Sequence, residues 1–165
     1  MILLVAYGNE LRQDDGAGLL LAQMLERRWQ AAGCRVRRIA VQQLTPELAP
    51  DIAGSDVSAV VFVDSRISAQ LTGEAVDVTP LQAPVGSSPC LGHHLQPEAL
   101  LSIAEQLYAR PASAPAWLVT VPGVAFGYGD TISETAQVAI RAALDASDSA
   151  LHALLGHQAI ARSCQ

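Results

Sequence analysis

The chain has 165 residues, of which 50% are hydrophobic and only 16% are charged, a composition that excludes intrinsic disorder. No apolar run reaches the ~20 residues of a membrane helix, and the apolar start lacks the basic flank of a signal peptide. The formal net charge of −6 speaks against nucleic acid and anionic membranes as partners. We therefore expect a single domain over residues 1–165 without membrane insertion, its last ten or so residues forming a flexible tail.

Lysine and cysteine usage restricts the chemistry. All ten basic residues are arginine, so no lysine is present for Schiff-base catalysis or a phosphate-binding loop. The cysteines Cys34, Cys90 and Cys164 are an odd, scattered set without zinc-ribbon spacing. They predict no disulfide framework, which suits a reducing cytoplasm.

Apolar runs alternate with helical patterns, which predicts an α/β fold: three αβα layers around a mostly parallel, twisted sheet of about five strands with helices on both faces. The predicted strands cover residues 2–7, 35–41, 59–63, 74–78 and 116–121. The arginines of the second strand place it at or near an edge, and the uninterrupted apolar third strand belongs in the centre.

The predicted helices begin near residues 17, 45, 97 and 134. The first carries leucines at helical spacing, and the second is a short helix opened by Thr45-Pro46-Glu47. The last follows a capping-box pattern at Thr131 to Glu134 and runs to about residue 155. Residues 81–92 are rich in Pro, Gly and Ser and predict a loop.

In open parallel sheets, ligands bind outside the carboxyl ends of the strands. Asp15 follows the first strand, Asp64 ends the central one, and the loop after the fourth strand carries His93 and His94. Two carboxylates and an imidazole suit zinc, nickel or a similar divalent ion. Binding would weaken on acidification, because His93 would be protonated.

Each of these residues has a structural alternative. Asp14 or Asp15 could cap the helix that begins near Gly16, the more common role for an acid at that position. Asp64 ends an apolar strand and needs a partner, which Arg66 or a backbone amide could supply. His93 in a polar loop is usually only a surface histidine.

Three further patterns are weak signals. Cys90 and His93 form a C-x-x-H pair without a second half, and the distal His152 and His157 have the wrong spacing for one helix face. The glycines of residues 123–129 indicate either tight turns or close approach of the backbone to a ligand. They do not form a dinucleotide-binding fingerprint.

Residues 8–18 read Gly-Asn-Glu-Leu-Arg-Gln-Asp-Asp-Gly-Ala-Gly. This stretch resembles the N-terminal signature of the hydrogenase maturation endopeptidases, which process the large subunit of nickel–iron hydrogenases. Segments 41–49, 62–65, 93–95 and 127–134 are similar to further parts of that family, so the resemblance spans nearly the whole chain.

The resemblance implies a metal-dependent, aspartyl-type endopeptidase that removes the C-terminal extension of a nickel–iron hydrogenase large-subunit precursor after nickel insertion. Carried over by position, the metal-binding and catalytic residues are Asp15, Asp64 and His93, with the adjacent His94 making the third ligand the least secure. The nickel would be supplied by the precursor, as the recognition element, and zinc or cadmium could occupy the same site in vitro.

Two other functions compete with this one. A non-catalytic nickel-binding or checking module of the same fold would use the same three residues. A phospho-receiver domain also has acids after its first and third strands, but it needs a lysine after its last strand, and this chain has none.

Overall fold

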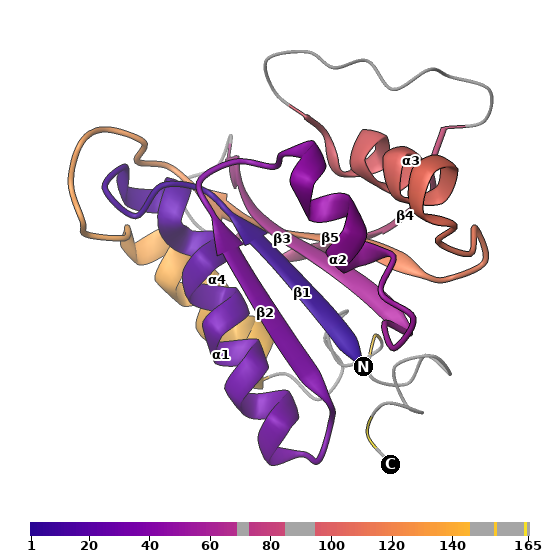
Figure 1. The fold of residues 1–165 in the computed structure, drawn as a ribbon. Helices are drawn as coiled ribbons and strands as arrows, with labels where there is room; N and C mark the ends of the chain where they lie inside the picture. Colours follow the sequence, from indigo (N-terminus) through magenta and orange to yellow (C-terminus); the bar gives the residue numbers. More distant parts are fainter. Residues whose placement is uncertain (69–72, 85–94, 146–153, 155–163, 165) are drawn as a thin grey trace.

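A computed structural model describes residues 1–68, 73–84, 95–145, 154 and 164. Its five strands form one sheet in the order β2-β1-β3-β5-β4 (Figure 1). The strands are β1 (Ile2–Tyr7), β2 (Val36–Val41), β3 (Ala59–Ile67), β4 (Asp77–Leu81) and β5 (Ala116–Gly123). The helices are α1 (Ala17–Ala31), α2 (Ala49–Ile52), α3 (Pro97–Tyr108) and α4 (Glu134–Asp145), with 3-10 turns η1 (Gln13–Gly16) and η2 (Pro46–Leu48).

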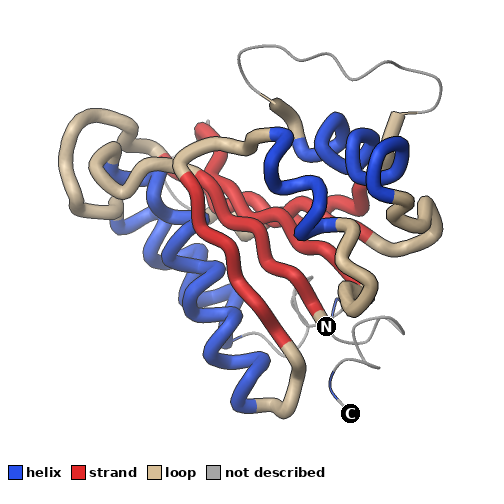
Figure 2. The backbone as a smooth tube through the Cα atoms, in the orientation of Figure 1, coloured by secondary structure: helices blue, strands red, loops and turns tan. Residues whose placement is uncertain are grey.

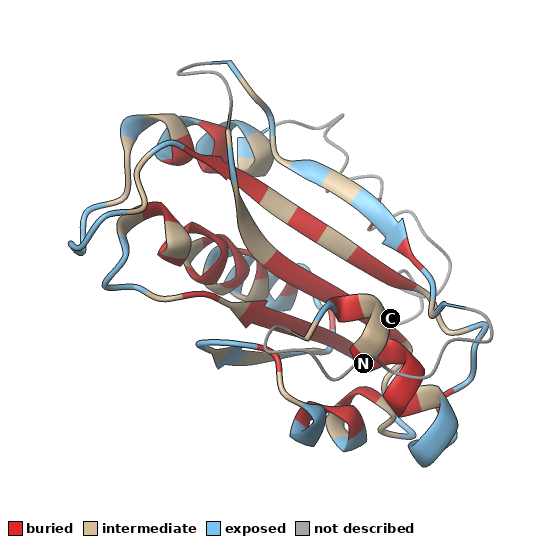
Figure 3. Cartoon of the chain, turned by 90° about the horizontal axis from the view of Figure 1, so that it is seen from above, coloured by how far each residue is buried: buried red, intermediate tan, exposed pale blue. Residues whose placement is uncertain are grey.

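Helices cover both faces of the sheet, so the predicted three-layer αβα architecture is confirmed (Figure 2). Side chains alternate between the two faces along each strand. In β1, Ile2 and Leu4 pack in the cluster with α1 and α4, whereas Leu3 and Val5 pack in the cluster with α2 and α3. Both clusters are buried along the middle of the sheet (Figure 3).

β3 is the central strand, as its apolar sequence predicted. It pairs in parallel with β1, where Leu4 lies opposite Val61, and in parallel with β5, where Val61 lies opposite Trp117. The strand extends to Ile67 rather than ending at Val63. Because β1, β3 and β5 run in the same direction, their carboxyl ends lie at one edge of the sheet.

The two outer strands differ in how well the sequence predicted them. β2 lies at one edge of the sheet, as its arginines indicated. β4 lies three residues later than the predicted strand at 74–78 and is antiparallel to β5. Its Pro80 has no N–H to donate and is accommodated because β4 is an edge strand, so Leu81, predicted as loop, ends the strand.

The prediction that the cysteines form no disulfide is wrong. Cys34, between α1 and β2, is bonded to Cys164 with an S–S distance of 2.07 Å. Sequence spacing could not find this pair, because 130 positions separate the two residues and only the fold brings them together. Cys90 lies outside the described residues.

The chain beyond Asp145 is described only at two positions. Leu154 is helical and buried against the α1 and α4 side of the sheet, and the rest of the predicted extension to about residue 155 lies outside the described residues. Among the helices of the described chain, none is long and apolar enough to cross a membrane.

Candidate functional site

Asp15 and Asp64 come close enough to interact at the carboxyl edge of the sheet. Asp64 lies in β3 on the face that Val60 and Phe62 share with α2 and α3. Asp15 lies in η1, between β1 and α1, and its negative charge contributes to raising the pKa of Asp64. Two acids separated in the sequence are therefore electrostatically coupled at the place where ligands bind in parallel sheets.

The environment of Asp64 disfavours its charged form. Burial, with a smaller contribution from Asp15, raises the pKa of Asp64 to about 6, although hydrogen bonds from the Ser65 backbone and the Tyr7 side chain act in the opposite direction. The Ser65 N–H donates to Asp64 Oδ1 at 2.7 Å. A cation between Asp15 and Asp64 would relieve both the desolvation and the repulsion.

The partner of Asp64 is thus a backbone amide, one of the two alternatives that the sequence left open. Arg66, the other alternative, turns to Glu74 instead, with its Nη1 2.5 Å from Glu74 Oε2. The carboxylate of Asp64 is consequently not neutralised by Arg66.

Glycines of the 8–18 motif allow Asp15 and Asp64 to approach one another. A Cβ atom on Gly18, in the first turn of α1, would lie 2.7 Å from the carbonyl carbon of Asp64. Gly8 has a φ of +140° and a Cβ there would collide with the carbonyl oxygen of Asp15. The Asn9 N–H then donates to Asp15 Oδ2 at 2.9 Å. The motif is therefore a set of close backbone contacts.

Asp14 has a different role from its neighbour. It is fully buried, and its Oδ2 accepts hydrogen bonds from the backbone of Val124 and Ala125 and from Ser133 Oγ, at 2.7, 2.9 and 2.7 Å. Its Oδ1 accepts from the Ser133 N–H at 2.7 Å. Burial alone would raise the pKa of Asp14, but these hydrogen bonds lower it overall. Asp14 therefore fastens η1 to the loop between β5 and α4.

The helix-capping alternative for Asp14 and Asp15 is wrong. The N-cap of α1 is Gly16, and no side chain caps that end of the helix. The capping contact of α4 is made instead by Ser133, whose Oγ accepts from the Ala136 N–H at 3.3 Å. The start of α4 thus depends on the residue that also binds Asp14.

The glycines at the end of β5 and in the loop that follows it lie in close contact with residues 13 and 14. A Cβ on Gly123 would lie 2.6 Å from the Cβ of Asp14. The Gly127 N–H donates to Gln13 Oε1 at 3.0 Å, and the Gln13 N–H donates to the Gly129 oxygen at 2.9 Å. These contacts join the loop after β1 to the loop after β5.

His93 and His94 lie outside the described residues, as do Cys90, His152 and His157. The described chain resumes at Leu95, and α3 begins at Pro97. Burial is the main cause that raises the pKa of Tyr7, and the charge of Glu98, in the first turn of α3, makes a small further contribution. Within the described residues, no group of three or more His, Cys, Asp or Glu side chains could hold a metal ion.

Tyr7 is the residue of this site that the sequence analysis missed. It appeared only as the end of the first strand, but its side chain is close enough to Asp64 to lower the pKa of that carboxyl. The signal was present in the register: Ala6 lies opposite Val63, which puts Tyr7 beside Asp64. Using that signal requires knowing that the two strands are parallel neighbours.

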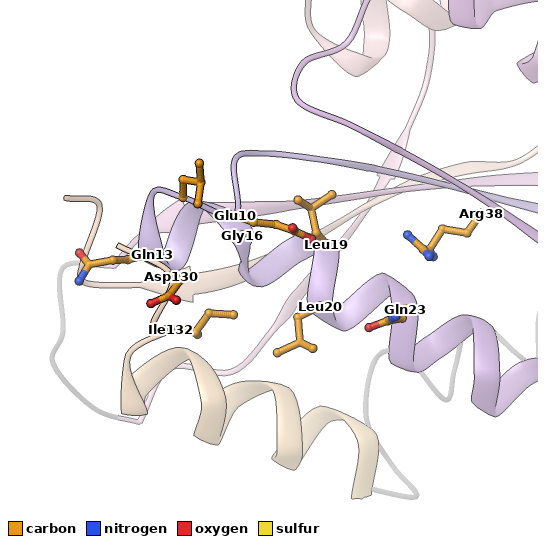
Figure 4. A pocket seen from close by; sticks show the side chains of 10 residues that line it. Glu10, Gln13, Gly16, Leu19, Leu20, Gln23, Arg38, Asp130 and Ile132 are labelled. Atoms are coloured by element: carbon orange, nitrogen blue, oxygen red, sulfur yellow. The ribbon is translucent and has the colours of Figure 1, made fainter. Parts of the chain in front are cut away.

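Two pockets lie next to this site. One, of about 370 Å³, opens between the start of α1 and the loop before α4 (Figure 4). Its lining includes Glu10, Gln13, Leu19, Arg38 and Asp130. The other, of about 490 Å³, lies at the carboxyl ends of β1 and β2. Neither pocket includes Asp15 or Asp64, so neither is the candidate metal site.

Searches against protein-family models and against curated proteins found no match. Among solved structures, the hydrogenase maturating endopeptidase HybD from E. coli has a TM-score of 0.58 at 19% sequence identity, covering 94% of this chain and 91% of its own. The [NiFe] hydrogenase maturation protease HycI from Thermococcus kodakarensis has a TM-score of 0.56 at 17% identity, covering 97% and 92%.

The hydrogenase 2 maturation peptidase from a Thaumarchaeota archaeon has a TM-score of 0.54 at 19% identity and covers 99% of both chains. These matches extend over nearly the full length of the chain. The chain has the fold of the hydrogenase maturation endopeptidases, and the fold implied by the sequence resemblance is confirmed.

Proposed function

We propose that this chain is a hydrogenase maturation endopeptidase, which removes the C-terminal extension of a nickel–iron hydrogenase large-subunit precursor after nickel insertion. The observation that carries the proposal is the coupled pair of Asp15 and Asp64 at the carboxyl edge of the sheet. It is supported by the likeness of the fold to solved structures of hydrogenase maturation endopeptidases and proteases.

The pair is suited to a divalent cation because both acids are carboxylates and Asp64 is not neutralised by Arg66. Two carboxylates leave open positions on the ion for a third protein ligand and for groups of the substrate. We propose His93 as the third ligand. In support of this choice, α3 starts four residues after His93 and packs on the face of the sheet that carries Val60, Phe62 and Asp64.

In this proposal the nickel arrives with the precursor. Asp15, Asp64 and His93 would bind an ion that the precursor already holds, so a loaded precursor binds more tightly than an empty one by the free energy of these contacts. The site then acts as a check on nickel insertion. When bound, the ion can also polarise the scissile carbonyl or activate a water.

The test is a processing assay with purified full-length protein. Nickel-loaded and nickel-free precursors are incubated with it, and the released tail is followed by mass spectrometry. We expect cleavage of the loaded precursor alone, and its loss in Asp15→Asn, Asp64→Asn and His93→Ala. Asp130→Asn is the matched control, because Asp130 is an exposed acid of the neighbouring loop.

Two outcomes would contradict the proposal. Tight binding of the loaded precursor without cleavage would favour a non-catalytic nickel-checking module. Equal cleavage of the nickel-loaded and the nickel-free precursor, or full activity of Asp64→Asn, would show that the acidic pair does not recognise the metal.

A further inference from the structure

Large hydrophobic side chains are exposed at the edge of the sheet where Asp15 and Asp64 lie. Among the described residues, eight large hydrophobic side chains are exposed. Four of them lie at the carboxyl end of β3 or in the loops that follow β1 and β5: Leu11, Ile67, Val124 and Tyr128. We call these four residues the apolar rim. Leu11 lies four positions before Asp15 and Ile67 three positions after Asp64, so the rim borders the candidate metal site.

Backbone contacts between distant segments join the rim into one surface. The Gly129 N–H donates to the Leu11 oxygen at 3.0 Å, which fixes the loop after β5 against the loop after β1. The two loops lie side by side beyond the end of the sheet (Figure 1). Ile67 lies opposite Gly123 in the pairing of β3 with β5, and Val124 follows Gly123 directly. The exposed side chains therefore belong to segments that are held next to one another.

The backbone around Tyr128 is fixed on both sides, although Tyr128 itself is 97% exposed. The Gly127 N–H donates to Gln13 Oε1 at 3.0 Å, and the Gly129 oxygen accepts from the Gln13 N–H at 2.9 Å. A side chain presented from a fixed backbone loses little conformational freedom when a partner covers it. Tyrosine is also among the residues that most often dominate the binding energy of protein interfaces. Tyr128 is thus a preorganised aromatic anchor without a partner in the described chain.

The composition of the rim indicates the kind of partner that fits it. No charged residue occurs between Arg110 and Asp130, so the loop after β5 has no charged side chain over residues 123–129 with which to bind a charged ligand. The cores of protein–protein interfaces are likewise poor in charged residues and rich in aromatic ones. Contiguous exposed apolar patches mark such interfaces. The complement of the rim is therefore an uncharged, apolar protein surface.

We propose that the apolar rim is a docking surface for the hydrogenase large-subunit precursor, which contacts it through an apolar patch of its own. This inference rests on the proposed function. A protein that brings its own metal ion to Asp15 and Asp64 has to approach the carboxyl edge of the sheet, and there it meets the rim. Because the rim contacts protein and not the ion, it binds nickel-loaded and nickel-free precursor equally. The acidic pair then supplies the difference between the two.

Two explanations compete with this one. Hydrophobic side chains scattered singly over a surface need no partner, and an apolar surface also fits a second copy of this chain. The double variant Leu11→Ala/Tyr128→Ala tests all three, because it removes the two side chains at which the loops meet. Its matched control is Leu107→Ala/Tyr108→Ala, which makes the same two truncations at exposed positions. These residues end α3, and the chain leads from there to the start of β5, at the opposite edge of the sheet.

The experiment compares full-length wild type with the two double variants, after urea unfolding has shown that all three are folded. Binding of nickel-free precursor is measured by biolayer interferometry, KM and kcat by processing of nickel-loaded precursor, and the oligomeric state of each protein alone by sedimentation velocity. We expect Leu11→Ala/Tyr128→Ala to weaken binding of nickel-free precursor by about 10–100-fold. It should raise KM for loaded precursor by the same factor and leave kcat within about twofold. Leu107→Ala/Tyr108→Ala should match wild type in every measurement.

Three results would overturn the inference. They are wild type that binds no nickel-free precursor, equal losses in the two double variants or none in either, and a wild-type dimer that the rim variant dissociates. Failure of the proposed function looks different, because wild type itself would then leave the loaded precursor uncut. Precursor binding that still depends on Leu11 and Tyr128 would in that case support the docking surface without the protease.

Discussion

Gly18 in the first turn of α1 lies directly against the backbone of Asp64 in β3. A Cβ atom at position 18 would come within 2.7 Å of the Asp64 carbonyl carbon and 2.8 Å of its Cα. Neither atom can move away, because β3 is the central strand and is paired on both sides. The last glycine of the 8–18 motif therefore sets how closely the helix that follows Asp15 approaches the strand that carries Asp64.

We predict that Gly18→Ala destabilises the protein by about 1–3 kcal/mol, as overpacking does in a close-packed interior. Helix propensity alone predicts a gain of about 1 kcal/mol for the same change, so the two causes differ in sign. Urea unfolding measures the outcome. Ala31→Gly, at the exposed end of the same helix, is the control and should cost no more than about 1 kcal/mol. A more stable Gly18→Ala protein would contradict the close contact.

Asp64→Asn should stabilise the protein at neutral pH while abolishing precursor processing. The folded-state pKa of Asp64 is raised to about 6, so its ionisation costs folding free energy as the pH rises from about 4 to about 6 and remains unfavourable above that range. Asparagine carries no charge, and its oxygen can still accept from the Ser65 N–H. We expect a gain of about 1–3 kcal/mol at pH 7.5.

The control for Asp64→Asn is Val61→Ala on the same strand. Val61 is fully buried, so its truncation should cost about 1–3 kcal/mol and leave the processing activity of the folded protein in place. Thermal unfolding from pH 4 to 8 tests the pH dependence. If Asp64→Asn stabilised the protein as much at pH 4 as at pH 7.5, the cost of ionising Asp64 would not be the cause of the gain in stability.

Asp14→Ala should be strongly destabilising because it leaves the backbone donors of Val124, Ala125 and Ser133 without their acceptor. We expect a loss of about 2–5 kcal/mol, and a smaller loss of about 1 kcal/mol for Ser133→Ala, which removes one hydroxyl bond and the cap of α4. Asp130→Ala, an exposed acid in the same loop, should change stability by less than about 0.5 kcal/mol.

The pH dependence of Asp14 has the opposite sign to that of Asp64. Its folded-state pKa is lowered, so the stability that it contributes is present above the unfolded carboxyl pKa of about 3.9 and is lost as the pH falls toward the folded value. Asp14→Ala should therefore reduce the loss of stability on acidification below pH 4. An unchanged acid-unfolding profile would contradict this role.

The disulfide between Cys34 and Cys164 predicts that the denatured, non-reduced protein has one thiol available for labelling, since the chain has three cysteines. After reduction three thiols should react. Reduction should also lower the stability of wild type by about 2–4 kcal/mol and leave Cys34→Ser unaffected. Three reactive thiols without reductant would contradict the disulfide. The cysteines would then again favour a reducing cytoplasm, as the sequence predicted.

Local patterns in the sequence were sufficient for most of the architecture. The apolar run at residues 59–63 predicted a central strand, and the arginines of 35–41 predicted an edge, because burial and hydration act on each segment separately. The strand predicted at residues 74–78 was misplaced because it, too, was judged from its own segment alone. Its position is set by antiparallel pairing with β5, and Pro80 is tolerated only because no further strand lies beyond it.

The sequence also identified Asp15 and Asp64 as residues of one edge, because the carboxyl ends of parallel strands meet there. It could not separate Asp14 from Asp15. Only the tertiary structure decided that the first is buried among the amides of the β5–α4 loop and that the second is close enough to Asp64 to contribute to raising its pKa. Likewise, the place of Tyr7 beside Asp64 and the disulfide between Cys34 and Cys164 depend on residues far along the chain. Such contacts are fixed by the register and packing of distant segments, which composition and periodicity do not encode.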